Sequence, residues 1–88
     1  VSKSAQIFLT KELAIRLSKK KISVNSISFG GIKGRASKSF LRKYKKNSPS
    51  GRMLDKNDLF EAVRFSLNNK NHQMTGHNLV IDGGWSVW

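Results

Sequence analysis

The sequence has no cysteine, a single proline and only 5 acidic residues in 88. The lack of cysteine excludes a disulfide framework, a thiolate zinc site and a thiol nucleophile, and we expect a cytoplasmic protein. No apolar run approaches the roughly 20 residues that span a bilayer, and the amino end lacks the pattern of a secretory signal. We therefore expect no membrane insertion.

The chain is long enough for one small unit. A unit of this size buries only about 60% of the surface of its unfolded chain, so we expect its core to need support from further polypeptide. The chain opens on Val1, directly before a predicted helix. We therefore expect a truncated protein.

Positive charge dominates, with 17 Lys plus Arg and a formal net charge of +12. One acid-free segment holds seven of these cations: Lys33, Arg35, Lys38, Arg42, Lys43, Lys45 and Lys46. Such a cluster, with Phe40 and Tyr44 inside it, could bind nucleic acid through counterion release and base stacking. A lysine-rich run is more often a solvated face, so we expect nucleic acid to be an unlikely partner; an anionic small substrate stays open.

The apolar pattern predicts alternating helices and strands. Spacings of three and four predict a helix over residues 4–17, and β-branched residues predict a strand over 22–29. Asp55 is a good N-cap for a helix that ends near Asn68 and Asn69, where Asn tolerates left-handed backbone angles. A second strand is predicted over 78–82. With a basic helical segment between the first strand and the second helix, this order favours an α/β fold with a parallel sheet.

Gly30 and Gly31 end the first predicted strand. We expect them to adopt backbone angles closed to other residues and to let a ligand approach the main chain.

Four segments in a fixed order carry a family resemblance: SKSA at 2–5, VNSISFGGI at 24–32, PSGR at 49–52 and TGHNLVIDGG at 75–84. Over nearly its whole length the chain resembles the carboxyl-terminal third of a short-chain dehydrogenase/reductase. The resemblance implies an incomplete Rossmann-like, doubly wound parallel sheet. Residues 74–88 look most like bacterial members of surface-polysaccharide or flagellin-sugar biosynthesis.

The resemblance divides the chain into four parts of one nicotinamide-binding domain. Residues 1–21 would form the helix that carries the active-site lysine, and 22–34 the strand and cofactor turn. Residues 35–50 would be the substrate lid, and 51–88 the last helix, last strand and tail.

Lys3 matches the lysine of the family's Tyr-x-x-x-Lys pair, whose tyrosine would lie two positions before Val1. A four-residue offset places both side chains on one helix face, so the ammonium can lower the phenol pKa. The resemblance implies that the phenol exchanges a proton with the substrate while hydride moves to or from the nicotinamide. Lys3 would also bind the nicotinamide ribose.

Gly30, Gly31 and Ile32 match the turn whose backbone meets the nicotinamide of NAD or NADP, a choice that these residues leave open. Phe29 replaces the usual proline and Gly34 the usual threonine. The Gly-rich pyrophosphate turn and the catalytic serine and tyrosine are not among the 88 residues. We therefore expect this chain alone to be inactive.

Within the implied lid, Arg35, Lys38, Phe40 and Arg42 are the candidate substrate contacts. Their basic character suits an anionic sugar or nucleotide-linked sugar as the carbonyl or alcohol substrate, and it equally suits a solvated lysine-rich face.

The remaining residues suggest scaffold and assembly. We expect Arg52 to anchor its loop, Asp82 to shape the exit from the last strand, and His72 and His77 to be loop residues that bind no metal. The apolar end, Trp85 to Trp88, suggests an interface of a homodimer or tetramer. The alternatives to an oxidoreductase are a non-catalytic oligomerisation remnant and a small basic nucleic-acid binder.

Overall fold

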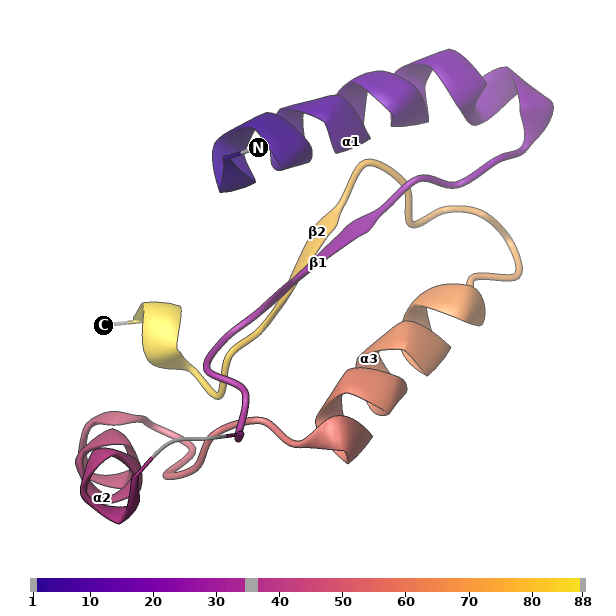
Figure 1. Ribbon diagram of the computed structural model, residues 1–88. Coiled ribbons are helices and arrows are strands. Elements are labelled where there is room, and N and C mark those ends of the chain that lie inside the picture. Colours follow the sequence, from indigo (N-terminus) through magenta and orange to yellow (C-terminus); the bar gives the residue numbers. More distant parts are fainter. Residues whose placement is uncertain (1, 35–36, 88) are drawn as a thin grey trace.

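A computed structural model describes residues 2–34 and 37–87 of the chain. Three α-helices and two strands follow in the order α1 (Lys3–Leu17), β1 (Ser26–Phe29), α2 (Lys38–Asn47), α3 (Lys56–Leu67) and β2 (Asn78–Ile81). Short 3₁₀ turns, η1 (Ser18–Lys20) and η2 (Trp85–Val87), follow α1 and β2. Figure 1 shows α1 and α3 on opposite sides of the strands, with α2 beyond the end of β1.

The two strands form a parallel pair. Ser26 lies opposite Asn78 and Phe29 opposite Ile81. The chain returns from β1 to β2 through two helices, the crossover that parallel strands require. This confirms the predicted α/β fold.

The helix ends follow local chemistry. The Ser2 hydroxyl accepts a hydrogen bond from the Ala5 N–H at the start of α1. Asp55 and Asp58 form a reciprocal capping box at the start of α3, as the predicted N-cap requires. Among the described residues beyond α3, the non-glycine residue with a left-handed backbone is His72, at φ 56°. The helix ends where it was predicted to, with Asn68 as its C-cap, but not for the reason given. The Asn68 N–H bonds back to the helix carbonyls of Arg64 and Phe65, and φ stays negative.

The first strand is shorter than predicted, because residues 22–25 make no ladder pairs with β2. Val24 and Asn25 instead bond to the loop before β2: the Val24 carbonyl accepts from the Gly76 N–H at 2.7 Å, and the Asn25 side chain donates to the Met74 carbonyl at 2.8 Å. Before β1 and β2 begin to pair, the Asn25 side chain thus connects the two segments in place of main-chain ladder bonds. The second strand likewise ends one residue early, before Asp82.

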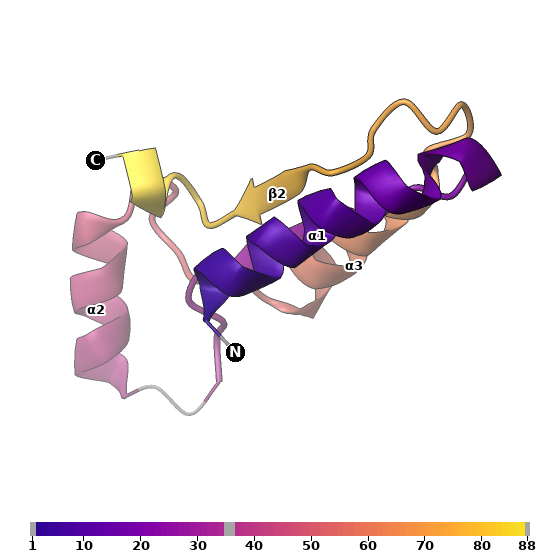
Figure 2. The same cartoon turned by 90° about the horizontal axis from the view of Figure 1, so that it is seen from above.

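The buried core is small. The buried apolar residues of the described part are Ala14, Leu54 and Ala62. Large apolar side chains of α1 and α3 are exposed, among them Phe8 at 65%, Ile15 at 74% and Leu67 at 79%. In Figure 2, α1 lies over the strands and α3 beneath them, so each helix has a free outer surface. None of the helices in the described ranges is long and apolar enough to cross a membrane.

Candidate functional site

An open cleft of about 500 Å³ lies between the first turn of α1, the carboxyl ends of the strands and the α2–η2 region. Its polar lining is Lys3, Ser28, Asn78, Asp82 and Ser86, and its apolar lining is Ile7, Phe29, Tyr44, Val80 and Trp85, together with Gly30 and Gly31. Ligands of open parallel α/β sheets bind outside the carboxyl ends of the strands. The position of this cleft therefore makes it the candidate site.

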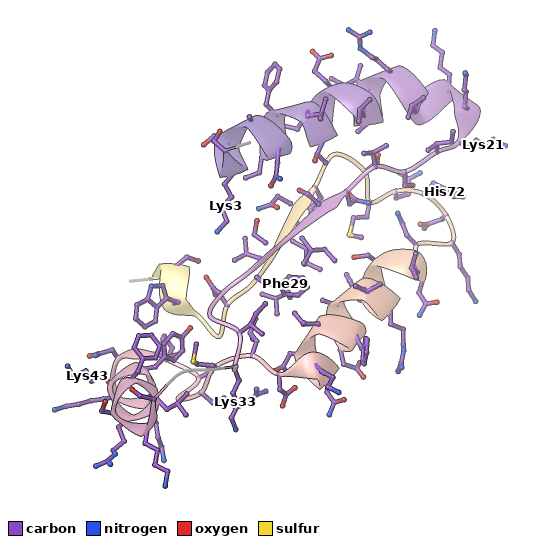
Figure 3. The ribbon with its side chains drawn as sticks, viewed as in Figure 1. Lys3, Lys21, Phe29, Lys33, Lys43 and His72 are labelled. Atoms are coloured by element: carbon purple, nitrogen blue, oxygen red, sulfur yellow. The ribbon has the colours of Figure 1, made fainter. Side chains whose placement is uncertain are left out.

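Lys3 is the cationic residue of the cleft lining. It occupies the first position of α1, directly after the N-cap Ser2, and its side chain extends from the helix toward the sheet (Figure 3). The ion pairs of the described residues all use arginine, so the Lys3 ammonium has no carboxylate partner there. The fold thus brings Lys3 into one cleft with Gly30 and Gly31, although they are far apart in sequence.

The unusual backbone angles expected for the two glycines are not found, and the expected approach of a ligand to their main chain stays a prediction. Neither Gly30 nor Gly31 has a positive φ. A Cβ on Gly30 would lie 2.8 Å from the Asp82 Cβ, and a Cβ on Gly31 would lie 2.8 Å from the Met53 Cε and 3.0 Å from the Tyr44 Cε2. At Gly30 the Cα and Cβ of Asp82 occupy the space that a side chain would need, whereas at Gly31 the nearest atom is the flexible end of Met53. The left-handed conformation plays no part at either position.

The turn uses some of its main-chain groups in hydrogen bonds within the chain and leaves those of Ile32 unpaired among the described residues. The Gly30 N–H donates to the Ile81 carbonyl at 2.9 Å, and the Gly31 carbonyl accepts from the Leu54 N–H at 2.8 Å. Ile32 bridges to Leu54, and its own N–H and C=O bond to no other described residue. The Ile32 side chain is 50% exposed and is not part of the cleft lining, in contrast to the two glycines.

The basic segment forms α2, which begins after the N-cap Ser37. Lys38, Phe40 and Arg42 are exposed and do not line the cleft, and Arg35 lies outside the described residues. The α2 residue that reaches the cleft is Tyr44. Its signal in the sequence was the four-residue spacing from Phe40, which places both rings on one face of the helix.

Trp85 is the second aromatic residue that the sequence analysis did not place in the site. Its ring stacks on Tyr44 with centroids 5.0 Å apart and planes 13° apart. The expectation of an apolar interface tail is therefore incomplete for Trp85, since this ring packs within the chain. The Val87 side chain and Trp88 lie outside the described part.

Asp82 shapes the exit from β2, as expected. Its carboxylate accepts from the Gly84 N–H at 2.9 Å and from the Ser86 N–H at 3.0 Å. Hydrogen bonds from the Ser86 side chain, and from main-chain N–H groups in the same turn, hold the pKa of Asp82 below its ordinary value. The group is thus an ionised cap at neutral pH and not a proton donor.

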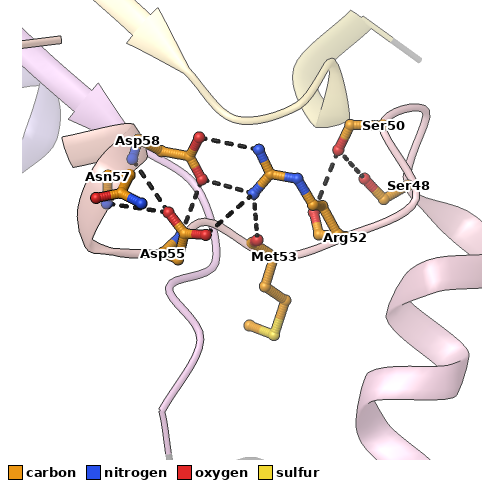
Figure 4. A network of polar contacts seen from close by, with 7 residues as sticks. All are labelled: Ser48, Ser50, Arg52, Met53, Asp55, Asn57 and Asp58. Atoms are coloured by element: carbon orange, nitrogen blue, oxygen red, sulfur yellow. Dashed lines mark hydrogen bonds and ion pairs between the residues drawn. The ribbon is translucent and has the colours of Figure 1, made fainter. Parts of the chain in front are cut away.

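Arg52 anchors its loop, also as expected, and does so through a partner that was not predicted. It donates to Asp58 at 2.6 and 2.9 Å and to the Met53 carbonyl at 3.1 Å (Figure 4). The Arg52 hydrogen bonds hold the pKa of Asp58 well below its usual range. The loop before α3 is therefore fastened to the first turn of that helix.

The histidines lie away from the cleft lining. His72 lies near the end of α1 that is opposite to Lys3 (Figure 3), and its Nδ1 is 3.1 Å from the Ser23 hydroxyl. No cluster of three or more potential metal-ligating side chains occurs among the described residues.

Comparisons with known proteins identify the family. A family model described as enoyl-(acyl carrier protein) reductase matches residues 1–86. Post-translational flagellin modification protein A of Campylobacter coli is 37% identical over 75 residues, which cover 85% of this chain and 29% of that protein. The 3-oxoacyl-[acyl-carrier-protein] reductase FabG of Buchnera aphidicola is 36% identical over 87 residues, covering 94% and 36% of the respective chains.

A solved structure agrees with this result. The short chain dehydrogenase of Leptospira borgpetersenii, with bound NAD⁺, superposes with a TM-score of 0.85 at 39% identity, over 96% of this chain and 33% of that one. The chain thus belongs to the short-chain dehydrogenase/reductase family and has the fold of an incomplete Rossmann domain. It spans only about a third of the length of these relatives.

Proposed function

We propose that this chain supplies one wall of the active site of a cytoplasmic NAD(P)-dependent oxidoreductase. The enzyme would transfer hydride between nicotinamide and a carbonyl or alcohol substrate. The observation that carries the proposal is the common cleft of Lys3 and the Gly30–Gly31 turn at the carboxyl ends of the strands. The NAD⁺ bound to the Leptospira relative supports a nicotinamide cofactor.

Lys3 would act on two partners. Its ammonium would donate to the nicotinamide ribose hydroxyls, and it would lower the pKa of a tyrosine one helical turn earlier. Because no carboxylate of the described chain pairs with Lys3, its full charge is available for these interactions. The tyrosine would then donate or accept the proton at the substrate oxygen.

The cofactor turn suits a planar amide ligand. The N–H and C=O of Ile32 bond to no other described residue, so they can donate to and accept from a carboxamide. Phe29 lines the cleft and would place a ring beside that amide. Bound nicotinamide would supply the hydride or accept it, and the residues of this chain would orient the ring.

The substrate that we favour is a sugar or nucleotide-linked sugar of surface-glycan biosynthesis. The support is the similarity to a flagellin modification protein, together with the cationic α2 beside the cleft. Of the predicted lid contacts, Lys38, Phe40 and Arg42 would meet the substrate only if α2 moved toward the cleft. Tyr44 already lines it.

The test is a comparison of Lys3 variants in the complete enzyme to which these residues would belong. Lys3→Gln should lower kcat/KM by about 10²-fold or more, the usual range for loss of acid–base assistance. Lys11→Gln, which removes the same charge from α1, should leave it unchanged. Equal rates for the Lys3 variant and the wild type would overturn the assignment. The 88-residue chain alone should show no substrate-dependent oxidation of NADH or NADPH.

A second candidate function is a non-catalytic oligomerisation module. The exposed apolar surfaces of α1 and α3, with Phe8, Ile15 and Leu67, favour it because such patches usually mark interfaces. Sedimentation of the complete protein to which these residues would belong, with and without NADH, separates the two functions. An assembly that forms but binds no dinucleotide supports the module, and dinucleotide binding supports the oxidoreductase part, in a dimer or tetramer.

A further inference from the structure

A second, smaller hollow lies beside α2. Lys43 is on the opposite face of that helix (Figure 3). The hollow has a volume of about 200 Å³, and its lining includes Lys33, Lys45, Arg52 and Met53. A water molecule takes up about 30 Å³ in the liquid, so the hollow has room for a compact polyatomic anion. It is separate from the cleft that contains Lys3.

The charge of this hollow is not neutralised within the described chain. The four ion pairs there use Arg16, Arg52 and Arg64, and each of their carboxylates faces an arginine. Asp82 is held by main-chain donors of its own turn. Lys33 and Lys45 are thus left without a carboxylate partner, and residues 13–54 contain no acid.

Arg52 and Asp55 set the remaining charge at the rim. The Arg52 guanidinium donates two hydrogen bonds to Asp58, so that its charge is already paired with a carboxylate. Asp55 also lines the hollow, but its carboxylate accepts from the first N–H groups of α3 and lies 4.0 Å from Arg52. The two lysines are therefore the cations that an incoming anion would meet.

The hollow adjoins the cleft. Met53 lines the hollow and Tyr44 lines the cleft, and both side chains lie over Gly31, 2.8 and 3.0 Å from where its Cβ would be. Two side chains, one of them a flexible methionine, thus separate the two spaces. One small molecule could therefore reach from the cleft to the hollow past Tyr44 and Met53.

We propose that this hollow binds a phosphate group. A phosphate monoester carries about −1.5 to −2 charges at neutral pH. The two ammonium groups of Lys33 and Lys45 balance this charge more closely than they would balance the single charge of a carboxylate. Lysine binds phosphate as a point charge, without the planar geometry that arginine requires. We further expect this phosphate to be part of the substrate whose carbonyl or alcohol group occupies the cleft, and that step rests on the proposed function. The binding of phosphate to the hollow does not depend on the proposed function.

The test is titration of the protein with inorganic phosphate at constant ionic strength, followed by calorimetry and by NMR of the backbone amides. Saturable binding is expected, with shifts at Lys33, Lys45 and Leu54. Lys33→Gln and Lys45→Gln should each weaken binding about three- to fivefold, as for loss of one exposed charge interaction. Lys43→Gln removes the same charge from the far side of α2 (Figure 3) and should leave the affinity unchanged.

Several results would overturn the proposal. These are equal weakening by Lys43→Gln, weakening by Lys38→Gln instead of Lys33→Gln, or tighter binding of acetate than of phosphate. Non-saturable binding would do the same. Circular dichroism of each variant separates loss of the site from loss of folding. Phosphate binding by the complete protein to which these residues would belong, without dinucleotide binding by that protein, would leave this site standing and remove the oxidoreductase proposal.

Discussion

The ring of Trp85 lies flat against the ring of Tyr44, 5.0 Å away between centroids. This contact joins the basic helix α2 to the turn that follows β2, across about 40 residues of sequence. Phe40 extends the aromatic row, with its ring centroid 6.3 Å from that of Tyr44. The position of α2 therefore depends on the end of the chain as much as on its own sequence.

Loss of this stack should loosen α2. An aromatic pair contributes about 0.5–1.5 kcal/mol beyond its buried area, which corresponds to up to about a tenfold change in an opening equilibrium. We expect Trp85→Ala to accelerate tryptic cleavage after the lysines of α2 by up to about tenfold. Trp85→Phe keeps an aromatic face, so its cleavage rate should lie between those of the wild type and Trp85→Ala. Unchanged cleavage in Trp85→Ala would show that other contacts position the helix.

Two carboxylates should make stability depend on acid. The pKa values of Asp58 and Asp82 are lowered in the folded chain, by Arg52 and by hydrogen bonds of Ser86 respectively. A lowered folded pKa stabilises the fold above the unfolded value, about 3.9, and this contribution disappears as the pH falls through the folded pKa.

We therefore expect Tm to hold between neutral pH and about pH 5 and to fall below about pH 4. Asp58→Asn should lower Tm at neutral pH and flatten the acid limb of the curve. A wild-type Tm that stays constant down to about pH 3 would contradict the assigned ion pair. Thermal melts by circular dichroism provide the measurement.

The capping box of α3 should be measurable by itself. Asp55→Ala removes the acceptor for the N–H groups of Asn57 and Asp58 and should cost about 1 kcal/mol of unfolding free energy. Asp55→Asn keeps a side-chain oxygen and should cost less. Urea denaturation distinguishes these cases, and equal losses in the two variants would mean that the charge matters more than the hydrogen bonds.

Gly30 should tolerate no side chain. A Cβ there would lie 2.8 Å from the Asp82 Cβ and 2.9 Å from its Cα, so Gly30→Ala must push the ends of the two strands apart. Overpacking of this kind costs about 1–3 kcal/mol. Gly34→Ala is the control, because nothing lies within 4 Å of its added Cβ. If both variants unfold at the same urea concentration, the close approach at Gly30 is not as tight as described.

The local elements could be predicted because their causes are local. The spacing of Leu9, Leu13 and Leu17 favours α1, and Asp55 with Asp58 specifies the start of α3. The Val-Ile-rich segments and the glycines after them predict two parallel strands. The match of Lys3 to a family motif also came from the sequence, and the structure places it in the same cleft as the glycine turn.

The errors were of another kind. The first strand was predicted four residues too long, since nothing in residues 22–25 reveals that the partner segment turns away. The glycine turn was given a conformational reason, whereas its neighbours Asp82, Tyr44 and Met53 come from distant parts of the chain. Lys38 and Arg42 were chosen for their charge within the lid that the resemblance implies, and their contact with substrate stays a prediction; neither lines the cleft, whereas Tyr44 of the same helix does.

The amino-acid sequence by itself determined the order of helices and strands, their caps and the excess of positive charge, because these depend on residues within one or two turns of each other. Only the tertiary structure decided which cations stay unpaired, which aromatic rings reach the cleft and why Gly30 has no room for a side chain. Those properties depend on the distances between side chains that folding brings together from remote positions, and no spacing along the chain encodes them directly.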